Sequence, residues 1–217
     1  EGSTGVDESG STDLFTVVLN AQPTTDVVLS ISSADTGEAT VTSSLTFTSS
    51  NWDTAKTVTV TGVDDNIIDG TQTSTITVSI IDGISDNAFD AVADQTVSVT
   101  TTDDDVAGFT IAETEGSTGV DESGSTDIFT IVLDTQPSSD VVLSITSSDT
   151  GEATVESLIQ FTSANWDTAQ NVTVTGADDG IIDGTQTSTI TVTVVDAITD
   201  DDFDAVADQT VSVTTTD

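Results

Sequence analysis

The sequence contains two nearly identical copies of one long segment. The run EGSTGVDESGSTD at residues 1–13 returns unchanged at residues 115–127, and without a gap Trp52 then matches Trp166 and Asp103 matches Asp217. A repeat of this length corresponds to a whole domain, because solenoid repeats are only about 20–50 residues long. We therefore expect two tandem copies of a single domain.

One segment, DDVAGFTIAET at residues 104–114, occurs once and lies between the two copies. Its alternating Phe109 and Ile111 predict a strand that opens the second domain. We place the boundary at Asp105, which gives domains 1–105 and 106–217. On this division the first domain lacks its own first strand, and we expect the chain to be a segment of a longer array.

Secondary structure is predicted to be almost entirely β. Apolar and polar residues alternate in KTVTVTG at residues 56–62, STITVSI at 74–80 and QTVSVTT at 95–101. A period of two is typical of half-buried strands, and no segment shows a helical period. About seven short strands in about 105 residues are typical of a β-sandwich. The predicted fold class is all-β, with two tandem immunoglobulin-like β-sandwiches of about seven strands each.

The charge balance excludes several classes of function. The chain has 39 acidic residues and a single base, Lys56, for a net charge of −38, and it contains no His or Cys. Thiol and imidazole chemistry and disulfides are therefore excluded. Repulsion from phosphates argues against nucleic acid as a partner, and no apolar run reaches the roughly 18 residues of a membrane-spanning helix. The acids require a counter-charge, and carboxylates suit hard cations such as Ca²⁺.

The acidic residues gather where apolar strands end, and they do so in both copies. In the first copy the clusters are Asp7 with Glu8, Asp35 with Glu38, residues 64–69 (DDNIID) and residues 103–105 (DDD). Loops at one end of a sandwich converge, and two carboxylates about 5 Å apart repel by about 3 kcal/mol at an effective dielectric near 20. A cation among them relieves this repulsion, whereas solvated turns and caps are the alternative for each cluster taken alone. The pattern is not an EF-hand, because Ile67 stands where a ligand belongs.

Three stretches of the sequence resemble the Calx-beta domain: VDESGSTDLFTVVL, TVTVTGVDDNIIDGTQTSTITVSI and VSVTTTDDDVAGFTI. The resemblance covers nearly the whole of each copy, and the acidic triplet in DDDVAGFT is its most specific part. It implies an immunoglobulin-like sandwich of seven strands, a module known from sodium–calcium exchangers, integrin β4 and many bacterial surface proteins. Some members bind several Ca²⁺ ions at one end.

The resemblance also implies which residues hold the ions, carried over by position. In the first copy these are Glu8, Asp64, Asp65, Asp69, Asp103, Asp104 and Asp105, with a backbone carbonyl of Ile67 or Ile68. In the second copy they are Glu122, Asp178, Asp179, Asp183 and Asp217, with the carbonyl of Ile181. Asp35 and Asp149 are the weaker candidates. The second set has no counterparts of Asp104 and Asp105, so we expect the second site to be the poorer one.

These observations predict a calcium-binding structural repeat that acts as a spacer or stalk in a secreted or cell-surface adhesive protein of a bacterium. The expected partners are calcium, neighbouring repeats and a host, cell-surface or polysaccharide ligand, with no nucleic acid and no membrane insertion. The alternatives are a specific carbohydrate- or receptor-binding domain, and a module that self-assembles by strand donation. An enzyme such as a two-carboxylate glycosidase is not expected, because the sequence indicates no cleft.

Overall fold

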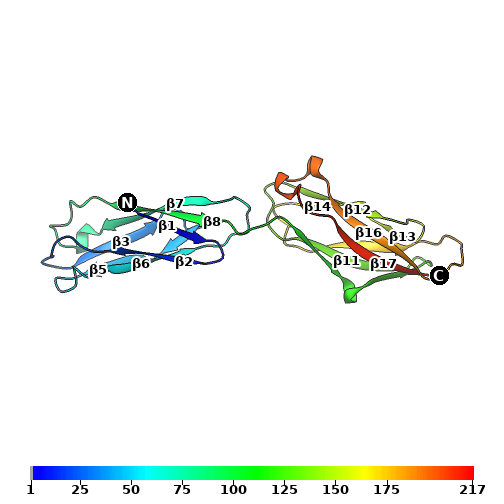
Figure 1. Cartoon of the computed structure of the whole chain (residues 1–217), viewed down its shortest axis with the longest axis horizontal. Helices are drawn as coiled ribbons and strands as arrows, with labels where there is room; N and C mark the ends of the chain where they lie inside the picture. The colour runs from blue at the N-terminus through cyan, green and yellow to red at the C-terminus, as the bar shows by residue number, and fades with distance from the viewer. Residues whose placement is uncertain (1) are drawn as a thin grey trace. The chain divides into compact units, whose positions relative to one another are not determined.

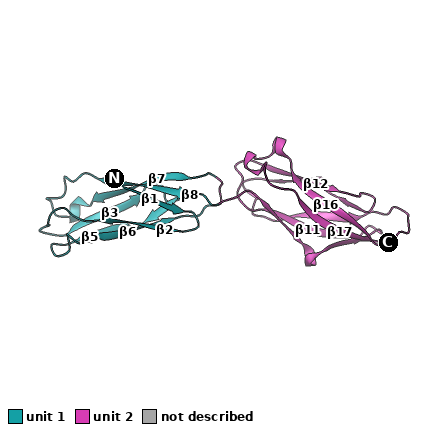
Figure 2. Cartoon of the chain, in the orientation of Figure 1, with its two compact units in different colours: residues 1–65, 69–104 teal, residues 66–68, 105–217 magenta. Residues whose placement is uncertain are grey.

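The chain folds into two compact units, each with its own hydrophobic core. A computed structural model describes residues 2–217 (Figure 1). Unit 1 comprises residues 1–65 and 69–104, and unit 2 comprises residues 66–68 and 105–217 (Figure 2). The core of unit 1 includes Phe47 and Ile76, and the core of unit 2 includes Phe129 and Phe161, all with no exposed surface.

Unit 1 is a sandwich of two sheets. The larger sheet has the order β1 (Gly2–Asp7), β8 (Gln95–Thr102), β7 (Gln72–Ile80), β3 (Val27–Ser33) and β5 (Ser44–Phe47). The smaller sheet has the order β2 (Thr12–Val17), β6 (Lys56–Gly62) and β4 (Ala39–Val41). All neighbours pair antiparallel except β1 and β8, which are parallel.

Unit 2 repeats this arrangement and carries one more strand. Its larger sheet has the order β10 (Thr118–Asp121), β17 (Gln209–Thr216), β16 (Gln186–Val194), β12 (Val141–Ser147) and β14 (Leu158–Phe161). Its smaller sheet has the order β13 (Ala153–Val155), β15 (Gln170–Gly176), β11 (Thr126–Leu133) and β9 (Phe109–Glu113). The strand predicted from DDVAGFTIAET is therefore present, at the edge of this sheet beside β11.

The period-two alternation of the sequence determines which faces are buried. In β6, Val58 and Val60 have no exposed surface, whereas the intervening Thr57 and Thr59 face outward or are half-buried. Thr and Val favour this pleated, half-buried environment, and the two inner faces together form the core. The all-β sandwich prediction is confirmed for both units.

The strand count differs from the expected seven, because unit 1 has eight strands and unit 2 has nine. Two kinds of short element account for the difference. The glycine-containing strands β1 and β10 lack the apolar alternation of the other strands, yet pair with β8 and β17. The three-residue strands β4 and β13 are too short to show a period. Among the described residues, helix is limited to four single 3₁₀ turns: η1 (Asp82–Ile84), η2 (Thr114–Gly116), η3 (Asp196–Ile198) and η4 (Asp201–Phe203).

Candidate metal centre

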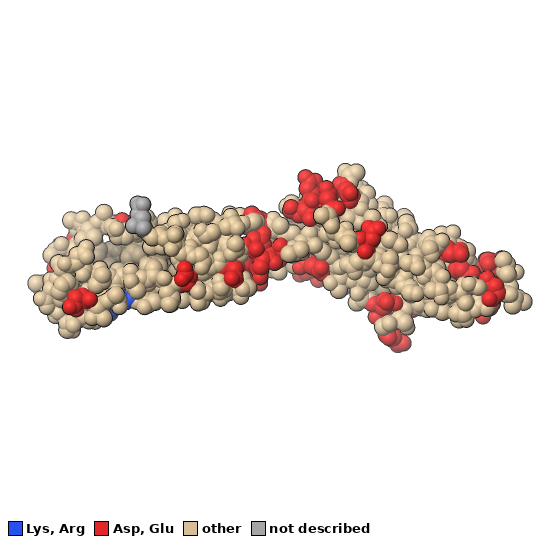
Figure 3. All heavy atoms as spheres, viewed as in Figure 1, with Lys and Arg blue, Asp and Glu red and all other residues tan. Residues whose placement is uncertain are grey.

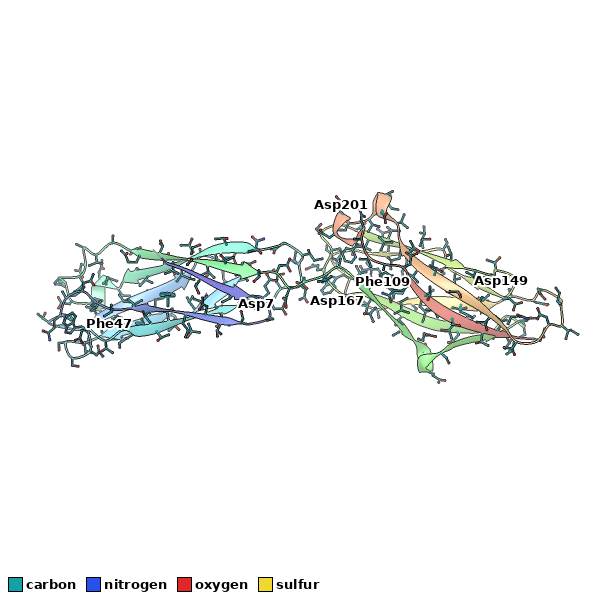
Figure 4. All side chains as sticks on the ribbon, viewed as in Figure 1. Asp7, Phe47, Phe109, Asp149, Asp167 and Asp201 are labelled. Atoms are coloured by element: carbon teal, nitrogen blue, oxygen red, sulfur yellow. The ribbon has the colours of Figure 1, made fainter. Side chains whose placement is uncertain are left out.

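The sandwich of unit 1 brings several acidic loops to one end. Glu8 follows the end of β1, Glu38 precedes β4, Asp69 lies in the loop after β6, and Asp103 follows β8. In Figure 4, Asp7 marks this end of the unit and Phe47 lies toward the opposite end. Carboxylates that are far apart in the sequence therefore meet here.

Three of these side chains form a compact carboxylate group. Glu8, Glu38 and Asp69 each offer an oxygen, and these oxygens lie within 4.8 Å of one another. Glu8 is 1% exposed and Glu38 is 8% exposed, so the two glutamates of this group are buried and form what we call its buried floor. The backbone holds both in place: Glu8 N donates to Thr102 O at 3.1 Å, and the carbonyl of Glu38 accepts from Val63 N at 2.9 Å.

The two buried glutamates lack protein partners for part of their charge. Glu8 Oε2 and Glu38 Oε2 are buried and accept no hydrogen bond. Burial, together with the nearby carboxylates of Asp103 and Asp65, raises the pKa of Glu8 to about 7. Burial and Asp69 likewise raise the pKa of Glu38. Ionised carboxylates are rarely buried without a partner, and these oxygens could hold a cation.

Asp103 shapes the loop that carries Asp69. Its Oδ2 accepts hydrogen bonds from the backbone N of Asp69 at 3.0 Å and of Gly70 at 2.8 Å. Gly70 has a φ of 69°, a conformation that an L side chain rarely adopts, so the glycine permits the turn after Asp69. The end of β8 therefore fixes the position of the β6–β7 loop over the buried glutamates.

Gly62 sets the distance between the two sheets at this end. A Cβ at this position would overlap the carbonyl oxygen of Asp7, the residue before Glu8. Gly62 N also donates to Ser11 O at 3.0 Å. The close approach of β6 to the end of β1 therefore requires glycine, and it brings the loop after β6 toward Glu8.

Unit 2 repeats the centre with its own residues. The oxygens of Glu122, Asp183 and Asp217 lie within 4.8 Å of one another, as do those of Glu152, Asp179 and Asp183. Glu122 Oε1 and Glu152 Oε2 are buried without a hydrogen-bond partner. Burial, followed by neighbouring carboxylates, raises the pKa of both glutamates. Asp217 accepts a hydrogen bond from Gly184 N, as Asp103 does from Gly70 N in unit 1.

The structure brings some of the sequence-predicted ligands together and separates others. Glu8 and Asp69, and in unit 2 Glu122, Asp179, Asp183 and Asp217, belong to compact carboxylate groups within their units. Asp65 and Asp103 lie near enough to Glu8 to raise its pKa. Asp64, Asp104 and Asp178 are exposed and join none of the carboxylate groups found among residues 2–217.

Asp35, Asp149, Ile67 and Ile181 have other surroundings. Asp35 and Asp149 cap their own turns by accepting from Gly37 N at 3.0 Å and Gly151 N at 2.9 Å. Asp105 opens the main segment of unit 2. Residues 66–68 belong to unit 2, in which Ile67 forms a parallel β-bridge with Gln136. Ile181 is 58% exposed, and its N donates to Asp179 Oδ1 at 2.7 Å.

The sequence analysis places Glu38 in an acidic cluster but names neither Glu38 nor Glu152 as a ligand. Both lie in D-T-G-E-A segments, in which the aspartates Asp35 and Asp149 are the weaker candidates of the sequence analysis. The glutamate stands directly before an alanine that is fully buried at the start of a strand. The glutamate side chain at that position is buried, whereas the aspartate three residues earlier accepts a hydrogen bond within the turn. An acid immediately before a buried strand residue was the available signal.

The protein has no cation of its own to neutralise these groups. Lys56 is the single base of the chain, and its Nζ donates to Thr46 O and lies 5.1 Å from the centre of the Phe47 ring. Figure 3 shows acidic side chains gathered at one end of unit 1, with the base away from them. A cluster of carboxylate oxygens without His or Cys suits a hard cation such as Ca²⁺, which takes six to eight oxygens in flexible geometry.

Among residues 2–217, no helix has the length and apolar character needed to cross a bilayer.

No protein-family model matches the chain, and no curated protein matches it either. Solved structures with a similar fold include the calcium binding domain CBD12 of CALX1.1, at 15% identity and a TM-score of 0.38 over 88% of this chain and 77% of that one. CBD12 from CALX1.2 has 14% identity and a TM-score of 0.38, over 98% and 97% of the two chains. The S-layer protein rSbsC(31-844) has 19% identity and a TM-score of 0.40, over 86% of this chain and 20% of that one. At these values the likenesses assign neither a family nor an activity.

Proposed function

We propose that the chain is a calcium-binding structural repeat module, in which Ca²⁺ at the acidic end of each sandwich stabilises and stiffens the domain. The observation that carries this proposal is the pair of glutamates in each unit that have a buried, unpartnered carboxylate oxygen. Glu8 and Glu38 in unit 1, and Glu122 and Glu152 in unit 2, each have a buried carboxylate oxygen without a hydrogen-bond partner. An ordinary solvated acidic surface does not require this arrangement.

The residues that would hold the ion in unit 1 are Glu8, Glu38 and Asp69, with Asp65 and Asp103 adding negative charge nearby. They come from four different loops, so one ion would tie together segments that are far apart in the sequence. A ligand that binds only the folded state stabilises it by about 2.7 kcal/mol at a hundredfold excess over Kd. Calcium would thus cross-link these loops in a chain that has no disulfides.

In this proposal the chain is a spacer or stalk of a secreted or cell-surface protein, and it is not an enzyme. Extracellular Ca²⁺ at about 1 mM would fill a site with a Kd of about 10⁻⁴ M almost completely, and a site with a Kd of about 10⁻³ M to about half. The acidic groups are part of a rigid end of a sandwich, and their chemistry there is coordination and charge neutralisation.

The test is calorimetric unfolding of the whole chain in chelator, with Ca²⁺ and Mg²⁺ added back separately. We expect a lower midpoint in chelator that Ca²⁺ restores and Mg²⁺ does not, because Mg²⁺ demands a smaller octahedral site. Isothermal titration with Ca²⁺ should show at least one ion for each unit. Unchanged unfolding together with no heat of binding would refute the proposal.

A further inference from the structure

The chain contains four Asp-Gly dipeptides, in which an aspartate side chain can react with the backbone N of the next residue. They are Asp69-Gly70, Asp82-Gly83, Asp179-Gly180 and Asp183-Gly184. The reaction requires that nitrogen to approach the side-chain carbon Cγ of the aspartate. Glycine permits the approach, because it has no Cβ to hinder it and its backbone is the least restricted of all residues. The surroundings of each pair then decide whether it can react.

In three of the four pairs, a carboxylate holds the N–H of the glycine. The hydrogen bonds run from Gly70 N to Asp103 Oδ2 at 2.8 Å, from Gly180 N to Asp178 Oδ1 at 2.9 Å, and from Gly184 N to Asp217 Oδ2. Hydrogen bonds to charged groups are stronger than neutral ones. Each of these must open before the nitrogen can turn toward Cγ, so the three pairs are protected.

The aspartate side chains of these three pairs are engaged as well. Asp69 and Asp183 belong to the carboxylate groups of their units. Asp179 Oδ1 accepts a hydrogen bond from Ile181 N at 2.7 Å. Both reacting groups are therefore held in place in these loops.

The fourth pair, Asp82-Gly83, has neither restraint. Both residues are exposed in the single 3₁₀ turn η1, whose backbone hydrogen bonds are long: 3.2 Å from Ile84 N to Ile81 O, and 3.4 Å from Ser85 N to Asp82 O. Among residues 2–217, no hydrogen bond is found to Gly83 N or to the carboxylate of Asp82. A Cβ at Gly83 would meet nothing within 4 Å, so the glycine has room to move.

Unit 2 has the same turn without the glycine. In η3 the corresponding residues are Asp196 and Ala197, both exposed, and Ile198 N donates to Val195 O at 3.1 Å. The alanine methyl group hinders the approach of the nitrogen and restricts the backbone. The two units thus provide a reactive turn and its unreactive counterpart in one chain.

We propose that Asp82 is a site of spontaneous isomerisation to isoaspartate. The nitrogen of Gly83 attacks Cγ of Asp82, and a C–N bond forms while a C–O bond of the protonated carboxyl breaks. The oxygen leaves as water with the amide proton, and a succinimide ring remains. Water then breaks the bond between the nitrogen and the main-chain carbonyl carbon of Asp82, so the backbone continues through Cγ and an α-carboxylate is freed. One water is lost and one is gained, and no other reactant is needed.

The product would lengthen the backbone by one carbon directly before two anchors of the fold. Ser85 Oγ accepts from Val28 N at 3.0 Å, and Asp86 Oδ2 accepts from Thr24 N at 2.6 Å. The freed α-carboxylate is the group that isoaspartyl carboxyl methyltransferases methylate, so the modified chain becomes a substrate for that class of enzyme. The inference does not depend on calcium, because Asp82 belongs to none of the carboxylate groups found among residues 2–217.

The test is to age the whole chain in chelator at neutral pH and physiological temperature for several weeks. Trypsin has only Lys56 as a target, so the map uses a protease that cleaves before aspartate but not before isoaspartate. Mass spectrometry locates the uncut sites, and an isoaspartyl methyltransferase with labelled methyl donor counts them. Isoaspartate at Asp82 should form at least about tenfold faster than at the other three Asp-Gly pairs, because a charge-assisted hydrogen bond must open there first.

Gly83→Ala gives unit 1 the dipeptide of unit 2 and should reduce isoaspartate at Asp82 to the level at Asp196. Isoaspartate at Asp82 that is no higher than at Asp196 in the unaltered chain, or that persists in Gly83→Ala, would overturn the proposal. Calcium should leave the rate at Asp82 unchanged. Slowing by calcium would overturn the assignment of this turn as a site independent of the carboxylate groups.

Asp103→Ala tests the protection of the other pairs. It removes the acceptor of Gly70 N, so isoaspartate at Asp69 should rise while Asp82 is unaffected. Circular dichroism checks that the variant folds, and Gly83→Ala keeps the test decisive if it does not. An unchanged rate at Asp69 in a folded Asp103→Ala chain would show that the hydrogen bond does not protect, and the reasoning that singles out Asp82 would fail.

Discussion

Replacing Glu8 with glutamine should have opposite effects on stability without and with calcium. Glutamine keeps the shape of the side chain and removes its charge. In the calcium-free chain the ionised carboxylate is 1% exposed, has an oxygen without a partner and faces other carboxylates. Glu8→Gln should therefore raise the free energy of unfolding of unit 1 in chelator.

The magnitude follows from the pKa. A rise in the pKa of Glu8 from 4.5 to about 7 means that ionisation is harder in the folded state. At 1.36 kcal/mol for each pKa unit this sets an upper limit of roughly 3 kcal/mol at pH 8, and solvent screening reduces it to about 1–3 kcal/mol. With saturating calcium, Glu8→Gln should instead lower the free energy of unfolding. Each tenfold loss of affinity for Ca²⁺ removes about 1.4 kcal/mol of stabilisation.

Differential scanning calorimetry at pH 8, in chelator and in millimolar Ca²⁺, measures both effects. Asp53→Asn is the matched control: it also removes one negative charge, but Asp53 is exposed and belongs to none of the carboxylate groups found among residues 2–217. It should change neither midpoint appreciably. If Glu8→Gln lowered the stability of the calcium-free chain, the carboxylate would be satisfied within the fold and the reasoning from burial would fail.

Three further results are expected. Because the folded pKa of Glu8 lies above its unfolded value of 4.5, the calcium-free chain should lose stability as pH rises from about 5 to 8; a flat profile in urea unfolding would contradict this. Gly62→Val should destabilise unit 1 by about 1–3 kcal/mol, because its Cβ overlaps the carbonyl of Asp7. Gly83→Ala is the control: its Cβ has open space, so the stability should change by no more than about 0.5 kcal/mol. Thermal melts of both variants check this. Hydrogen bonds from three backbone N–H groups and a hydroxyl lower the pKa of Asp86, so Asp86→Ala should lower the urea midpoint at pH 7, and by less as pH falls below 3.8.

Much of the fold could be predicted from the sequence, because burial in a sandwich follows the alternation of side chains. The segment KTVTVTG, which the alternation predicts to be a strand, forms β6, and both of its valines are buried. The parallel pairing of β1 with β8 could not be predicted, since it joins Val6 to Thr101 and β1 contains two glycines and no apolar alternation. Pairing over such a distance depends on the closed sandwich rather than on local propensity.

The candidate site was predictable in outline but not in its buried floor. Counting acids at strand ends points to the end of the sandwich where carboxylate groups gather, and it includes Glu8 and Asp69. It did not distinguish Asp35, which caps its own turn, from Glu38, which is 8% exposed. The two differ by three positions in one loop, and only the packing of the residue after Glu38 decides which carboxylate turns inward.

The acidic residues of the chain therefore form two groups, which differ in how well water and salt screen their charges. Many of the 39 acids are exposed or are held by hydrogen bonds in their own turns, as Asp35 is, and water and salt screen them. The buried glutamates, of which Glu8 and Glu38 are the pair in unit 1, are shielded from that screening. In the proposed function these glutamates are neutralised by coordination to an ion rather than by general screening. Monovalent salt would then relieve the repulsion at the surface, but it would not replace a divalent ion coordinated by oxygens that lie within 4.8 Å of one another.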